Sequence, residues 1–120
     1  MKNKALIYLN KCAPHKESLG LRKEKCLEYA KENGFDINPE TDIYISECIA
    51  DEECGDANIR TINQLQEMLS TEFVRRILIV YDQNSVTDDY LQNYITNFAK
   101  KGVVLRTAVK SPLTIKICEN

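Results

Sequence analysis

The 120-residue chain has the length of one compact domain with a single core, and its 43% apolar and 28% charged residues are ordinary for a globular protein. It contains no run of about 18 apolar residues, which excludes a membrane-spanning helix, and charge resumes directly after the short apolar stretch near the N-terminus, as in a first strand and unlike a signal peptide. The net charge is −2, and residues 40–59 carry seven acidic side chains without a lysine or arginine, so tight DNA binding by this chain alone is not expected.

Short apolar runs predict buried strands, and segments of helical periodicity separate them. The strands are expected at 5–9, 43–46, 77–81 and 103–109, with 114–118 as a candidate fifth. The helices are expected at 18–33, 61–73 and 87–99, the first capped by Ser18 and ended by Asn33-Gly34. The acidic stretch 47–58 has no apolar period and is predicted to be a mobile loop.

This alternation of strands and helices predicts the α/β class. We expect one three-layer domain over residues 1–120, with a mostly parallel sheet of four or five strands in flavodoxin-like order and helices on both faces. In such sheets the functional site lies beyond the carboxyl ends of the strands. The candidate loops are therefore 10–17 after the first strand and 82–87 after the third, with the acidic stretch as a third wall.

The cysteines do not predict a metal site or a disulfide framework. The five thiols belong to Cys12, Cys26, Cys48, Cys54 and Cys118, with no CxxC pair and no zinc-like spacing. We expect them to be free in a reducing cytoplasm, and we expect no metal and no cofactor. His15, the only histidine, is predicted to be a solvated loop residue.

Several short segments match, in order, the motifs of a known family. They are Tyr8 to Cys12 (Tyr-x-Arg-x-Ser in that family), Ser18 to Phe35 (SLxxQxxxCxxYAxxNGF), Asn58 to Arg60 (an Asp-Arg-Pro-like helix start), Ile77 to Val86 (an apolar strand followed by Asp-Arg-Leu-x-Arg) and Gly102 to Val104 (a Gly-Val turn). Over roughly its first 110 residues the chain therefore resembles the N-terminal catalytic domain of the serine recombinases, the resolvase/invertase family.

The resemblance implies a site in which a serine attacks the scissile phosphate and arginines stabilise the developing charge. Here Cys12 stands at the position of the nucleophile, and Asn10, Gln83 and Val86 stand at three arginine positions.

Of the motif residues, Arg60 and Asp82 persist, and Lys11, Lys16 and Arg60 are the candidates for binding phosphate. Arg60 near a helix start has an alternative role, in which it pairs with a neighbour such as Asp56. Each electrostatic group is commonly worth a few kcal/mol in the transition state, so we expect the cleavage site to be degenerate.

Three hypotheses for function follow. The leading one is a resolvase-like domain from a mobile element that has lost the ability to cleave DNA and acts as an interaction or regulatory module. Its expected partners are DNA, bound weakly, a second copy of the chain or an active recombinase. The first alternative is a divergent recombinase in which Cys12 attacks DNA and Arg60 stabilises the phosphate. The second is a flavodoxin-like domain that binds a small ligand or nucleotide, although no glycine-rich loop supports it. We expect the chain to lack the family's dimerisation helix and DNA-binding module, and we expect a cytoplasmic location.

Overall fold

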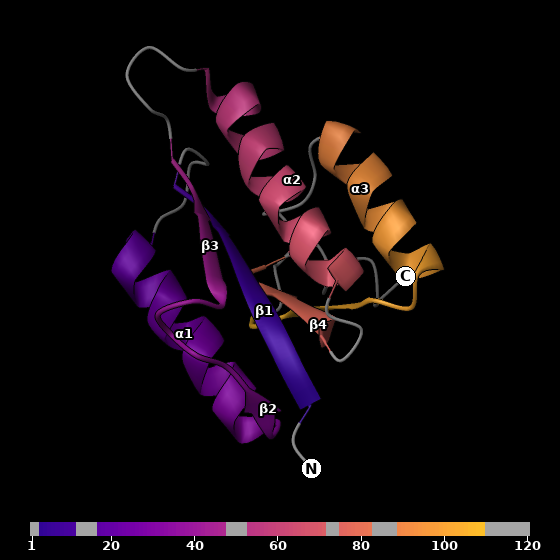
Figure 1. Cartoon of the computed structure of the whole chain (residues 1–120). Coiled ribbons are helices and arrows are strands. Elements are labelled where there is room, and N and C mark those ends of the chain that lie inside the picture. Colours follow the sequence, from indigo (N-terminus) through magenta and orange to yellow (C-terminus); the bar gives the residue numbers. More distant parts are fainter. Residues whose placement is uncertain (1–2, 12–16, 48–52, 72–74, 83–88, 110–120) are drawn as a thin grey trace, which may run out of the picture.

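The structure is a computed structural model and describes residues 3–11, 17–47, 53–71, 75–82 and 89–109. A sheet forms the middle layer, with β1 (Asn3–Asn10) in its interior. The helix α1 (Leu19–Glu32) covers one face, whereas α2 (Cys54–Thr71) and α3 (Asp89–Lys100) lie side by side on the other (Figure 1). The predicted α/β class, with helices on both faces of the sheet, is confirmed.

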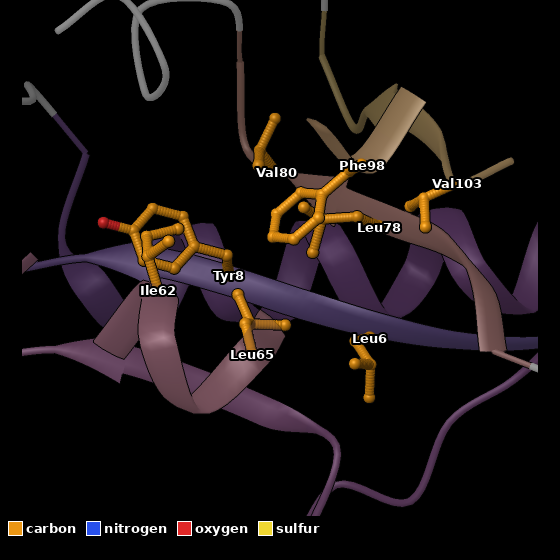
Figure 2. Packing of buried hydrophobic residues seen from close by; sticks show 8 residues of the cluster. All are labelled: Leu6, Tyr8, Ile62, Leu65, Leu78, Val80, Phe98 and Val103. Carbon is orange, nitrogen blue, oxygen red and sulfur yellow. The ribbon is translucent and has the colours of Figure 1, made fainter. Parts of the chain in front are cut away.

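The strand β1 is apolar along most of its length because both of its sides are covered. Every residue from Ala5 to Asn10 is buried. Successive side chains of a strand point to opposite faces, so Leu6 and Tyr8 enter the cluster beneath α2 and α3, whereas Ile7 and Leu9 pack beneath α1. Figure 2 shows the first cluster, whose buried members are Leu6, Tyr8, Ile62, Leu65, Leu78, Val80, Phe98 and Val103.

The first helix begins and ends where the sequence predicts. The Ser18 backbone is extended, and its Oγ accepts a hydrogen bond from the Leu21 amide at 3.2 Å. At the other end Gly34 adopts a φ of 72°, a conformation that costs little without a Cβ atom. The short strand β2 (Phe35–Asp36) follows at once and was not predicted.

All described strand pairs are parallel. The strand β4 (Arg75–Val80) lies beside β1, and β5 (Val104–Thr107) lies beside β4. On the other side of β1, β2 pairs with its start and β3 (Ile43–Ser46) with its end. Since β2 and β3 share one edge position, this is the flavodoxin-like order that was predicted. The carboxyl ends of β1, β3 and β4 therefore lie next to one another.

The prediction of a loop throughout 47–58 is wrong in its last part. The helix α2 begins at Cys54, well before the predicted start at residue 61. Its first turns bury Ala57, Asn58 and Thr61. The sequence showed no apolar period here because two of these inward-facing side chains are polar and find hydrogen-bond partners in the interior.

The remaining boundaries shift by small amounts, and the candidate strand 114–118 lies outside the described residues. Within the described part of the chain, no helix is both long enough and apolar enough to cross a membrane.

Candidate functional site

The candidate site lies where β1, β3 and β4 end. The structure describes the site residues Asn10, Lys11, Arg60 and Asp82. Four other predicted site residues lie outside the described residues: Cys12, Lys16, Gln83 and Val86. Asn10 is buried at the last position of β1, and Asp82 is buried two residues beyond the end of the neighbouring β4.

A buried arginine that sequence reasoning missed fastens the chain at this edge. Arg22, in the first turns of α1, is only 4% exposed. Its Nη1 donates to the Asn10 carbonyl at 3.0 Å, and its Nε donates to the Glu17 carbonyl at 3.3 Å. These two carbonyls flank residues 11–16 on either side. Arg22 therefore ties both ends of the first candidate loop to the helix that follows it.

Two signals in the sequence point to Arg22. It follows Leu19 by three residues and precedes Cys26 by four, so it lies on the apolar face of α1, where a charge has to be paired. It also stands where the quoted first-helix motif has glutamine. Arg60 is therefore not the only guanidinium at this edge of the sheet.

Next to Arg22, a tyrosine at the end of β4 is held against the start of α1. Tyr81 is buried, and its side chain is hydrogen-bonded to Glu17. Burial raises the pKa of Tyr81, and the negative charges of Glu17 and Asp82 raise it further, while Arg22 opposes them. The phenol is therefore neutral over the physiological range and acts here as a donor.

The cysteine beneath Arg22 is a structural thiol. Cys26 is fully buried and free, and burial raises its pKa from 9.0 to about 12, with Arg22 lowering it and Asp82 raising it. A thiol that stays protonated at neutral pH is neither a nucleophile nor a good metal ligand.

On the opposite face of the sheet, a buried amide joins three elements. The Oδ1 of Asn58, in α2, accepts a hydrogen bond from the Tyr8 hydroxyl of β1 at 3.4 Å and another from the Ser46 hydroxyl of β3. One turn later the Thr61 hydroxyl donates to the Ala57 carbonyl at 2.9 Å. The two bonds of Asn58 fix the start of α2 against β1 and the end of β3, and with it the place of Arg60.

Both described candidates for phosphate binding contact Glu47. The Lys11 Nζ forms an ion pair with the Glu47 Oε1 at 2.6 Å, and the Arg60 Nη2 donates to the Glu47 carbonyl at 2.7 Å. The structure therefore brings Lys11 and Arg60 together. Arg60 lies in the second turn of α2 and not at its start, and its guanidinium is bonded to the main chain at Glu47.

At the carboxyl ends of the strands, the side chains of Lys11, Arg22 and Arg60 thus donate to oxygen atoms of the protein itself. Within the described residues, no group of three or more histidine, cysteine, aspartate or glutamate side chains could hold a metal ion. No model of a known protein family matches the sequence, and no curated protein matches it.

Proposed function

We propose that this chain is a resolvase/invertase-like domain that has lost DNA cleavage and acts in site-specific recombination as an interaction or regulatory module. The order of strands and helices supports this, as does the first helix with its Ser18 cap and Gly34 stop. A buried Asp82 at the end of β4, where the family's motif has aspartate, supports it further.

The observation that carries the loss of cleavage is the engagement of the cations. Lys11 donates to the Glu47 carboxylate, Arg60 to the Glu47 carbonyl, and Arg22 to the carbonyls that flank the first loop. Phosphoryl transfer is accelerated by cations that are aimed in advance at the non-bridging oxygens. Groups that already donate to protein oxygens would first have to break those bonds, and Asn10 supplies no charge where the family has an arginine.

The test uses supercoiled plasmid that carries the DNA flanking the gene. After incubation with the protein and denaturation in SDS, we expect no covalent protein–DNA adduct and no relaxed plasmid. In parallel, sedimentation velocity measures complexes of the chain with itself, with a duplex of the same DNA and with the catalytic domain of an active serine recombinase. Failure to form any of these complexes would contradict the role as an interaction module.

One observation favours a second candidate, the divergent recombinase that uses Cys12. The guanidinium of Arg22 is bonded to the carbonyl of Asn10, two residues before Cys12, and so adds a positive charge to this edge beyond that of Arg60. The same plasmid assay separates the two functions. A covalent adduct that is lost in a Cys12→Ala variant would establish the recombinase and reject the degenerate module.

A further inference from the structure

Glu47 contacts both of the described residues that are candidates for binding phosphate, Lys11 through its carboxylate and Arg60 through its main-chain carbonyl. Its carboxylate lies 2.6 Å from the Lys11 ammonium, a short charge-assisted contact, and its carbonyl accepts from the Arg60 guanidinium at 2.7 Å. Carboxylates and phosphates both present paired anionic oxygens to such donors. The contact made by the Glu47 carboxylate is therefore of the kind that a phosphate would make.

The backbone fixes Glu47 in this position. It follows directly after Ser46, the buried last residue of β3, whose carbonyl accepts from the Lys11 amide at 2.9 Å. The hydroxyl of Ser46 also bonds to Asn58, two residues before Arg60 on α2. Lys11, Glu47 and Arg60 thus project from three elements that are joined immediately beneath them.

The ion pair is nevertheless open to exchange. The side chains of Lys11 and Glu47 are 52% and 57% exposed, so anions in solution reach both groups. Exposed ion pairs of this kind contribute little to stability. A polyanion that offers several phosphates can therefore displace the carboxylate without unfolding the domain.

We infer that the Glu47 carboxylate is a built-in competitor for phosphate at Lys11, which lowers the affinity of this edge for a nucleic-acid backbone until a partner or a high local DNA concentration displaces it. The inference rests on the proposed function and adds to it the regulation of the same site. Glu47 also belongs to the segment 40–59, which carries seven acidic side chains and no basic one.

The test compares Glu47→Gln with a matched control. Glutamine keeps the size of the side chain and the main-chain acceptor for Arg60, and it removes only the charge that faces Lys11. Glu40→Gln makes the same change of net charge in an exposed turn before β3. Two probes are used: immobilised heparin, which requires no specific site, and a labelled 30-bp duplex of the flanking DNA in fluorescence anisotropy.

We expect Glu47→Gln to elute from heparin at higher salt than wild type and to bind the duplex roughly three- to ten-fold more tightly at low salt, as removal of one repulsive charge at contact distance implies. One additional phosphate contact makes the plot of log affinity against log salt steeper by about 0.9. Glu40→Gln is expected to differ little from wild type, and Lys11→Gln added to Glu47→Gln is expected to abolish the gain.

Equal behaviour of Glu47→Gln and Glu40→Gln on both probes would overturn the inference. A gain on heparin without duplex binding by any variant would support the role of Glu47 and count against a DNA-associated function. Glu47→Ala guards against residual hydrogen bonding by glutamine and is expected to match Glu47→Gln.

Discussion

Replacement of Arg22 by methionine tests whether the guanidinium holds the edge of the sheet together. Methionine has a similar length and fills the buried space between Leu19 and Cys26, but it donates no hydrogen bond and carries no charge. The change removes the 3.0 Å bond to the Asn10 carbonyl and the longer 3.3 Å bond to the Glu17 carbonyl.

The expected loss follows from the geometry. A hydrogen bond from a charged group contributes about 1.5–3 kcal/mol to stability. The bond to Asn10 is of ordinary length and lies in the interior, so the full contribution applies to it. The bond to Glu17 is long, so its contribution to stability is only a small fraction of that of the Asn10 bond. The desolvation cost that a buried guanidinium carries in the wild type is relieved by methionine. The net destabilisation is therefore about 2 kcal/mol.

Urea unfolding followed by far-UV circular dichroism measures this difference. With an m-value of about 1.5 kcal/mol/M, the midpoint is expected to fall by about 1.3 M. Lys25→Met removes a charge from an exposed position of the same helix and is expected to stay within about 0.5 kcal/mol of wild type. Arg22→Lys keeps the charge but cannot reach two carbonyls with one planar group, so its midpoint is expected between the others. An Arg22→Met midpoint equal to that of wild type would refute the role of the clamp.

Three further predictions concern the buried polar groups around the site. Asn58→Ala deprives two buried hydroxyls of their acceptor and should lower the free energy of unfolding by about 2 kcal/mol in the same urea assay. The control Asn63→Ala, on the exposed side of α2, should lower it by less than half as much. Equal losses would contradict the role of the buried amide. Cys26, with its pKa of about 12, should react with iodoacetamide at pH 8 at least about 100-fold more slowly in the folded protein than in urea. Peptide mass spectrometry measures both rates, and rapid labelling of the folded protein would show the thiol to be accessible. The raised pKa of Tyr81 means that the folded state holds the phenolic proton more tightly than the unfolded chain, whose tyrosines titrate near about pH 10. The stability that this proton contributes is complete below that pH and is lost as the pH rises through the folded pKa. Urea midpoints should therefore fall more steeply between roughly pH 9 and 11 for wild type than for Tyr81→Phe, and identical slopes would count against the shift.

The fold was largely predictable because its signals are local. The unbroken apolar runs of β1 and β4 indicated strands covered on both faces, and the alternation with helices indicated a parallel sheet. The limits of α1 followed from Ser18 and Gly34. The start of α2 was missed because Asn58 and Thr61 face inward, and a polar residue that is buried with partners has no signature in the periodicity of apolar residues.

The positions of the described candidate site residues on the sheet were predictable, whereas their contacts were not. The carboxyl ends of β1 and β4 were expected to form it, and Asn10 and Asp82 do lie there. Arg22 was overlooked because a charged residue within an amphipathic helix is usually solvated, and only its spacing from Leu19 and Cys26 indicated the apolar face.

The amino-acid sequence by itself determined the order of the elements and the strand edge at which polar residues collect. The tertiary structure alone decided what the remaining cations contact. Lys11 and Glu47 are 36 positions apart and meet because β1 and β3 pair in parallel, and Arg22 reaches Asn10 because α1 packs back over β1. Such contacts depend on the register of strands and the placement of helices, which are set by the burial of the whole core and not by any short stretch of sequence.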